Sequence, residues 1–200
     1  MLSSIHPLGE AGRNQRWWLT VAAHIAGSVL GAATVAAALG GLGWVAATAG
    51  LGWPARLVLI AVVAAVAVAV DARGWPSWLW RPHRQVNEDW LTRYRGWVYG
   101  GGFGLQLGMG ITTIVTAATL YLLGMVTFAL ANPLAAGAVG AVFGLVRGAS
   151  VLAGRSITAP ERLVAFHRGL QQRARWGKAA AVLADSSILV GTVGLLVAGR

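Results

Sequence analysis

The chain has no cysteine and few charged residues. Without cysteine it can form no disulfide, thiolate metal site, iron–sulfur cluster or thiol redox relay. Charged residues make up 11% of the sequence, whereas a soluble domain has roughly 25%. Apolar residues make up 56% and the mean hydropathy is +0.65. This composition is typical of an integral membrane protein.

The charge that is present is mostly positive. Sixteen Lys and Arg residues against six Asp and Glu give a net charge of +10. Such a balance can indicate nucleic-acid binding. Here the cations lie in the segments between apolar runs, which favours the lipid bilayer and anionic lipid headgroups as partners and not nucleic acid.

Long uncharged runs predict the transmembrane helices. A bilayer core of about 30 Å needs about 20 apolar residues in a helix. We therefore predict an all-α integral membrane bundle of five transmembrane helices plus a cytoplasmic amphipathic helix. The whole chain, residues 1–200, is predicted to be a single polytopic domain. The spans are expected at about residues 18–39, 55–71, 103–130, 134–153 and 179–198.

The first uncharged run is longer than one crossing needs. The surplus lies around Gly40, Gly41 and Gly43, where glycine weakens a helix. We expect the helix to end near Leu39 and residues 40–53 to form a short non-spanning or re-entrant segment. A cleaved signal peptide is the alternative, but its apolar region is usually shorter than this run.

Positive charge predicts the orientation. Cytoplasmic loops carry an excess of Lys and Arg. With the N-terminus in the cytoplasm, fourteen of the sixteen cations lie inside, and only Arg56 and Arg200 lie outside. We expect a bacterial inner-membrane protein with its C-terminus outside and a cytoplasmic loop from Asp71 to Trp97. Most tryptophans lie near span ends, as interfacial anchors do, although a ligand cage is an alternative.

A basic amphipathic helix is predicted at 158–177. Thr158-Ala-Pro-Glu161 resembles a capping box, and Leu163, Phe166 and Leu170 recur at helical spacing between arginines. Such a helix beside a membrane usually lies among the lipid headgroups. Docking of a partner protein is the alternative.

Small residues at helical spacing predict close helix packing, because they let backbones approach each other in lipid. Packing within the chain is one interpretation, and a homo-oligomer formed through the fourth span is the other. The residues are Gly27, Gly31, Gly104, Gly108, Ala136, Gly140, Gly144 and Gly148.

Polar residues within the spans are candidates for a transport path, because ionisable groups are costly in lipid. Asp185 is the only acid inside a predicted span, and Arg147 could form an ion pair with it. Gln106, Thr112 and Thr116 could line a path with Asp185. The threonines could equally bond back to their own helix.

The sequence offers little for catalysis. His24 is the only histidine within a predicted span, so no pair of intramembrane histidines could hold a haem. No spacing of His, Asp and Glu suggests a metal site. We expect no cofactor, no metal and no enzymatic activity.

Two segments carry a resemblance. Leu2-Ser-Ser-Ile-His-Pro-Leu-Gly-Glu10 before Arg16-Trp-Trp18, together with Trp97-Val-Tyr-Gly-Gly-Gly-Phe-Gly-Leu-Gln-Leu-Gly108, resembles a group of uncharacterised actinobacterial multi-pass membrane proteins. A looser likeness is to the transmembrane reductant carriers of cytochrome c biogenesis. Those carriers work through a membrane-embedded cysteine pair, which this chain lacks.

The sequence leaves two functions open. One is a small transporter or permease-like protein with a polar path between spans one, three and five. The alternative is a non-catalytic membrane scaffold or assembly subunit that acts through helix packing and its cytoplasmic loops.

Overall fold

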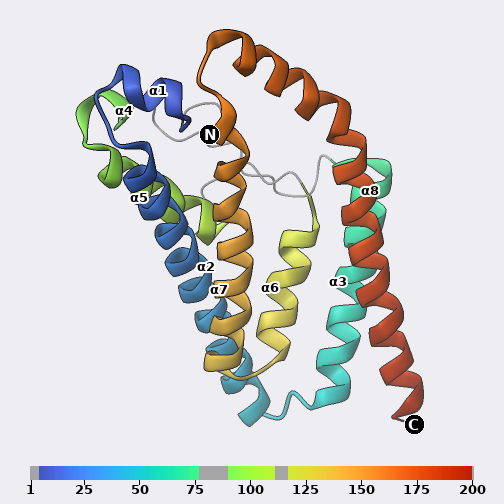
Figure 1. Cartoon of the computed structure of the whole chain (residues 1–200). Coiled ribbons are helices and arrows are strands. Elements are labelled where there is room, and N and C mark those ends of the chain that lie inside the picture. The colour runs from blue at the N-terminus through green and yellow to red at the C-terminus, as the bar shows by residue number, and fades with distance from the viewer. Residues whose placement is uncertain (1–4, 77–89, 111–116, 200) are drawn as a thin grey trace. The chain divides into compact units, whose positions relative to one another are not determined.

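The computed structural model describes residues 5–76, 90–110 and 117–199. Within these ranges every regular element is helical, which confirms the all-helical prediction (Figure 1). The helices in chain order are α1 (Pro7–Gly12), α2 (Trp17–Thr48), α3 (Trp53–Arg73), α4 (Trp90–Arg93), α5 (Gly96–Met109), α6 (Thr119–Ala129), α7 (Pro133–Ala149), the 3-10 helix η1 (Ser150–Ser156) and α8 (Pro160–Ala198).

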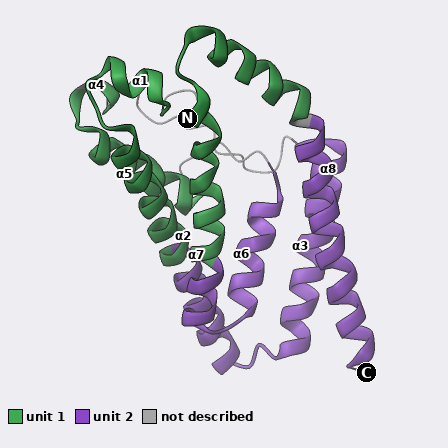
Figure 2. Ribbon diagram, in the orientation of Figure 1, with its two compact units in different colours: residues 1–34, 83–114, 140–173 green, residues 35–82, 115–139, 174–200 purple. Residues whose placement is uncertain are grey.

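The chain forms two compact units, each built from segments far apart in the sequence (Figure 2). Unit 1 comprises residues 1–34, 83–114 and 140–173, and unit 2 comprises residues 35–82, 115–139 and 174–200. Helices α2, α7 and α8 each contribute one part to each unit. Sequence neighbours therefore help to form different cores.

Helix α2 does not end near Leu39 as predicted. It continues to Thr48 over 32 residues, or about 48 Å at about 1.5 Å per residue. Gly40 and Gly43 lie within it and let other backbone approach. In unit 2, a Cβ atom at Gly43 would overlap the carbonyl oxygen of Phe128, and one at Gly40 would collide with Ala136. Packing against small residues offsets their weak helix propensity, so the predicted re-entrant segment is instead helix followed by a short turn.

In unit 1, the first half of α2 packs against α5 through glycines on both helices. A Cβ atom at Gly27 or Gly31 would overlap a backbone oxygen of α5. A Cβ atom at Gly104 or Gly108 would overlap a backbone oxygen of α2. The backbones are therefore in direct contact, and the two helices run in the same direction.

The second part of α7 packs on α2 in the same unit. Gly144 and Gly148 face the α2 backbone and side chain around Ser28. Ala136 and Gly140 continue the same buried stripe along α7. The sequence left two interpretations of this stripe, packing within the chain and oligomerisation. Where its contacts are described, the stripe packs against helices of the same chain.

The predicted third span, 103–130, is not one continuous helix. Helix α5 ends at Met109, and Gly110 adopts a left-handed conformation with φ of 71°. A residue with a Cβ atom would be strained there. Helix α6 begins only at Thr119 and has 11 residues, too few to cross a bilayer alone.

The core of unit 2 lies between α3, α6 and α8. The sequence of α3 is apolar on every face from Leu57 to Val70. In the structure one face is buried, while Val58 and Val62 on the other face are exposed. The buried residues of this core are Leu57, Ile60, Ala64, Ala67, Val70, Ala118, Leu122 and Ala129, with Ile188, Leu189 and Leu196 of α8 packed against them.

The predicted amphipathic helix and the predicted fifth span form one helix. Helix α8 runs without interruption from Pro160 to Ala198. Its first part, to residue 173, belongs to unit 1 and the remainder to unit 2. No proline or stable turn lies between the two predicted segments, so backbone hydrogen bonding continues from one to the next.

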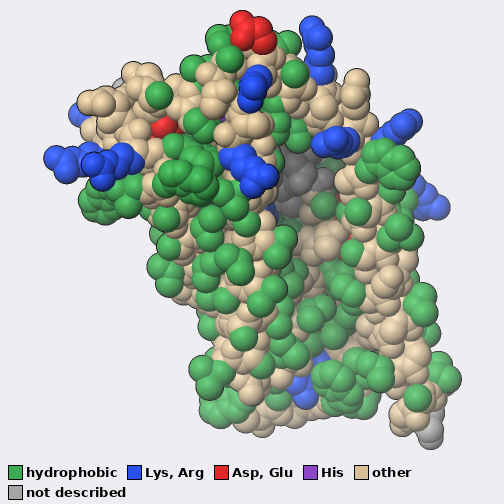
Figure 3. Space-filling view, viewed as in Figure 1, with side chains coloured by type: hydrophobic (Ala, Val, Ile, Leu, Met, Phe, Trp, Pro, Cys, Tyr) green, Lys and Arg blue, Asp and Glu red, His purple; other side chains and the backbone are tan. Residues whose placement is uncertain are grey.

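Four helical segments are long and apolar enough to cross a membrane. They are Trp17–Thr48, Trp53–Arg73, Pro133–Ser156 and Arg175–Ala198. Large apolar side chains are exposed along them, and hydrophobic groups occupy much of the surface seen in Figure 3. Exposed apolar surface on this scale is stable in lipid and costly in water. The structure therefore indicates a membrane protein with four candidate spans.

Candidate functional site

Three carboxylates are buried in the described part of the chain. Glu10 in unit 1 and Asp185 in unit 2 have no exposed surface, and Asp71 in unit 2 is 7% exposed. A buried carboxylate is costly unless donors or cations compensate it. What surrounds each acid therefore indicates what it can do.

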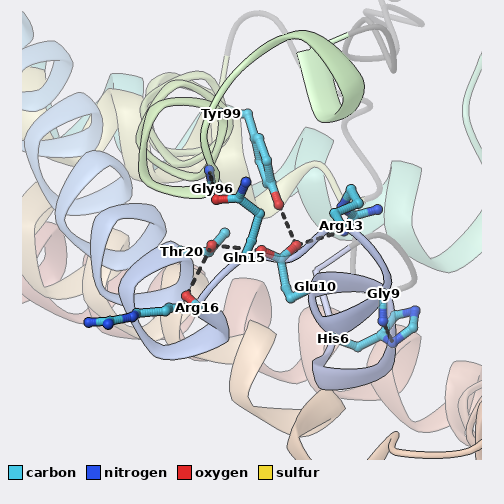
Figure 4. Close-up of polar contacts among 9 residues, drawn as sticks. All are labelled: His6, Gly9, Glu10, Arg13, Gln15, Arg16, Thr20, Gly96 and Tyr99. Carbon is cyan, nitrogen blue, oxygen red and sulfur yellow. Dashed lines mark hydrogen bonds and ion pairs between the residues drawn. The ribbon is translucent and has the colours of Figure 1, made fainter.

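Glu10 is compensated by three side chains from three elements (Figure 4). Its Oε1 accepts hydrogen bonds from Arg13 at 2.6 Å and from the Tyr99 hydroxyl. Its Oε2 accepts one from the Thr20 hydroxyl at 2.8 Å. Arg13 also forms an ion pair with Glu10. Hydrogen bonds to an ionised acceptor are roughly twice as strong as neutral ones.

The partners of Glu10 are themselves perturbed. Burial raises the pKa of Tyr99 to about 12, and its hydrogen bond to Glu10 adds to this effect. Burial disfavours the charge of Arg13, but the hydrogen bond to Glu10 and the further interactions with Tyr99 and Glu10 together outweigh burial and raise the pKa of Arg13. Tyr99 stays neutral and Arg13 stays charged at physiological pH.

The Glu10 cluster is a structural clamp. Each carboxylate oxygen accepts at least one hydrogen bond from this chain, and Glu10 has no exposed surface. Nearby, Gln15 accepts a hydrogen bond from the Gly96 backbone N–H at 2.9 Å, at the start of α5. Together these contacts fix α1 and the start of α2 against α5.

Asp71 caps the N-terminal end of α6. Its Oδ1 accepts a hydrogen bond from the Ala118 backbone N–H at 2.8 Å, and its Oδ2 accepts one from the Thr119 hydroxyl at 3.3 Å. The first N–H groups of a helix lack partners within the helix, and the helix dipole favours a negative charge there. Asp71 is therefore stabilised as an anion.

Helix α3 also caps the C-terminal end of α6. The Arg56 guanidinium donates a hydrogen bond to the Ala129 carbonyl at 2.8 Å. The last carbonyls of a helix lack internal partners and favour a cation. A short helix with both ends compensated is stable without water, which is what a membrane interior requires.

Asp185 has no such compensation. Both of its carboxylate oxygens are buried, and neither has a partner of hydrogen-bond geometry among the described residues. Asp71 and Thr119 lie within electrostatic reach of it. No Lys or Arg in the described part of unit 2 forms an ion pair with it. Both carboxylate oxygens of Asp185 thus remain able to bind a ligand, and the neighbouring acid is Asp71.

This arrangement can bind a small cation or exchange a proton. Asp71 and Asp185 supply up to four oxygens and Thr119 supplies a hydroxyl. No group of three or more His, Asp or Glu suited to a metal ion occurs in the part of the chain that the structure describes. The chemistry available is therefore that of a carboxyl pair.

The residues predicted from sequence belong to both units, and some lie outside the described residues. Gln106 lies on α5 in unit 1, and Thr112 and Thr116 lie outside the described residues. Arg147 lies in unit 1 with its guanidinium 5.6 Å from the Phe143 ring centroid, whereas Asp185 belongs to unit 2. The Arg147–Asp185 ion pair and the path through Gln106 therefore stay predictions.

Sequence reasoning missed two of the three buried acids. Asp71 was expected in a loop, but α3 extends past it to Arg73 and buries it. Its position directly after an unbroken apolar run was a signal that it lies at membrane depth. Nothing local marked Glu10, because its main partners are 10 and 89 residues away in the sequence.

No family model, curated protein or solved structure matches the chain. The resemblance to actinobacterial multi-pass proteins stays an expectation.

Proposed function

We propose that this protein is a small transporter or permease-like protein of the bacterial inner membrane. Its transport centre is the acid pair of unit 2, defined as Asp71 and Asp185 with the Thr119 hydroxyl. The observation that carries the proposal is the Asp185 carboxyl group, which is fully buried with both oxygens unpartnered.

The cost of such a group supports a functional role. An acid within a transmembrane segment costs on the order of 3 kcal/mol at the centre of a helix, and such residues commonly mark ion pathways. Glu10 recovers its cost through three donors, whereas Asp185 recovers none from the described residues. A ligand that compensates the Asp185 carboxyl group during part of a transport cycle would explain why this group is present at a cost to stability.

The interruption between α5 and α6 adds support. Transporters often place their sites where a transmembrane helix is discontinuous, with the end of a half-helix facing the ligand. Here the N-terminal end of α6 holds Asp71, and Thr119 is the first residue of that helix. This centre joins Asp71 and Thr119 to the predicted Asp185, and the path through Gln106 stays a prediction.

The proposal includes a fifth crossing over residues 103–130, as the sequence predicts. In unit 1, α5 follows the first half of α2 in the same direction. In unit 2, α6 ends against Gly43, later on α2. Five crossings place the N-terminus in the cytoplasm and the C-terminus outside, by the excess of inner arginines.

The first part of α8 is proposed to lie on anionic headgroups at the cytoplasmic face. Arg162, Arg168 and Arg173 are exposed along it, and Val164 and Leu170 are exposed between them. A polarity-sensitive dye attached to a Leu170→Cys variant should report an apolar environment in anionic bilayers. If the same dye reports a polar environment in uncharged bilayers, the helix prefers anionic lipid.

The scaffold alternative loses its main sequence support. It relied on a glycine stripe free to bind a partner, but Gly144 and Gly148 pack against α2. Homo-oligomerisation through that stripe would require the chain to break its own packing.

Transport by the acid pair can be tested in liposomes. The purified full-length chain is reconstituted with a pH-sensitive dye inside, and panels of amino acids, sugars, organic acids and organic cations are added outside. We expect one class to change the internal pH in the wild type. Asp185→Asn and Asp71→Asn should abolish that change, because each removes one carboxylate of the pair.

Glu161→Gln is the matched control. Glu161 is exposed on α8 and touches neither acid, so its loss should leave the signal intact. An equal signal in Asp185→Asn, or no signal with any class in the folded wild type, would contradict the transport proposal.

A further inference from the structure

We propose that Asp185 and Asp71 share one proton, carried by Asp185, and that this proton is the ion coupled to transport. The inference deepens the proposed function and depends on it for its meaning in transport. The sharing of the proton is a property of the pair itself and can be measured without any substrate.

Asp71 is the member of the pair whose negative charge the surrounding groups compensate. It is the only one of the two that receives hydrogen bonds, from the Ala118 N–H and the Thr119 hydroxyl. The N-terminal end of α6 adds a favourable dipole, worth about 0.3–1 kcal/mol when exposed and up to about 2 kcal/mol when partly buried. Both effects stabilise negative charge on Asp71.

Asp185 is the protonated member of the pair. Neither of its buried oxygens has a partner of hydrogen-bond geometry among the described residues, and the nearby Thr119 hydroxyl is donated to Asp71, so an anion on Asp185 would lose most of its hydration without replacement. Asp71 is a like charge within electrostatic reach, which also disfavours a second anion. One proton on Asp185 removes both penalties.

Among the described residues of unit 2, no cation forms an ion pair with Asp185. Helix α3 contributes Asp71, and α6 contributes the hydroxyl of Thr119. Within the described part of unit 2, Arg56 is engaged with the Ala129 carbonyl and not with the acids. Arg147 in unit 1 is the cation that the sequence nominates, so it is included in the test.

A proton fits the pair better than a metal ion. Hard divalent cations take six or more oxygen ligands, and no group of three acidic or histidine side chains occurs among the described residues. A proton needs one oxygen of Asp185. On release the O–H bond of Asp185 breaks, the bonding electrons stay on the carboxylate and the proton passes to water.

Infrared spectroscopy of the full-length protein in lipid tests this assignment. A protonated carboxyl group gives a C=O stretching band that an ionised one lacks. At neutral pH we expect one such band in the wild type, shifted in deuterated water. It should disappear in Asp185→Asn and persist in Glu161→Gln. In Asp71→Asn the band should be lost at a lower pH than in the wild type, because the like charge is gone.

Isotope labelling keeps the test valid if a variant does not fold. The sequence contains three aspartates, Asp71, Asp89 and Asp185. Carbon-13 labelling of aspartate in the wild type should shift the band, whereas labelling of glutamate should not. A band that follows the glutamate label, or no band at neutral pH, would overturn the proposal.

Two further outcomes count against a shared proton. Loss of the band on adding sodium at constant pH would assign the site to a metal cation. Appearance of the band only in Arg147→Gln would mean that Asp185 is ionised and paired with Arg147 in the wild type. A clear band in a protein that transports no solute would support the shared proton and reject transport. Transport of a solute without such a band would reject only the shared proton.

Discussion

Each buried carboxylate of this protein has a role set by the donors that reach it. Glu10 receives three side-chain hydrogen bonds, one of which is an ion pair with Arg13. Asp71 receives two hydrogen bonds from the start of α6. Asp185 receives none among the described residues. At the scale of residues, the same chemical group is a clamp, a helix cap or a binding group.

Replacing Glu10 with glutamine tests the clamp. The amide keeps the shape but loses the charge, and it presents N–H groups to donors that need an acceptor. We expect a loss of about 3 kcal/mol of unfolding free energy, as for a broken buried ion pair. Chemical unfolding in mild detergent measures it.

The exposed Glu161→Gln change provides the reference and should stay within about 0.5 kcal/mol of the wild type. Equal stabilities of the two variants would show that the Glu10 contacts contribute nothing net.

At the scale of elements, helix contacts depend on where a Cβ atom is missing. A Cβ atom at Gly104 would overlap the His24 backbone, whereas one at Gly101 on the same helix would lie 3.8 Å from the Ala23 carbonyl oxygen, in ordinary contact. Two glycines three residues apart therefore have different roles. One permits close approach, and the other is replaceable.

Alanine substitutions separate these roles. Gly104→Ala should destabilise the protein by about 1–3 kcal/mol, because its methyl group forces α2 and α5 apart. Gly101→Ala should be neutral or stabilising by up to about 1 kcal/mol, since alanine favours helix. Thermal unfolding of both variants in the same detergent compares them, and a more stable Gly104→Ala variant would refute the close α2–α5 contact.

The elements also show why α6 can be short. Asp71 and Arg56 of α3 satisfy its two ends. Sequence hydropathy merged α6 with α5 into one span, because apolar composition cannot reveal a left-handed residue such as Gly110. The break was therefore not predictable from periodicity alone.

At the scale of the whole molecule, the number of crossings decides where the two ends lie. Four crossings place both termini on one face, and five place them on opposite faces. The absence of cysteine makes this measurable, because any introduced cysteine is the only thiol in the chain.

Single cysteines at Gly12 and Gly199 test the number of crossings. Gly12 is exposed at the end of α1, and Gly199 is exposed just beyond α8. With five crossings, a membrane-impermeant maleimide should label Gly199→Cys in intact cells and reach Gly12→Cys only after the membrane is opened. Labelling of both from outside, or of neither, would contradict the fifth crossing.

The sequence by itself determined the helical class, the apolar segments and the predicted sidedness of the loops. Those properties follow from how each residue is solvated along a single helix, so neighbours in sequence suffice to predict them. It also singled out Asp185, because an acid within an apolar run can be recognised without knowing which residues surround it. The Gly40–Gly43 segment was misjudged, since its helix is maintained by packing partners that propensity does not include.

Only the tertiary structure decided which acids are satisfied and which is not. Asp71 and the start of α6 are 47 residues apart in the sequence, and Glu10 and Tyr99 are 89 apart. Such pairings depend on which helices meet and at what register. In a medium without water, that choice of neighbours determines whether a buried charge is stabilised or left free to bind.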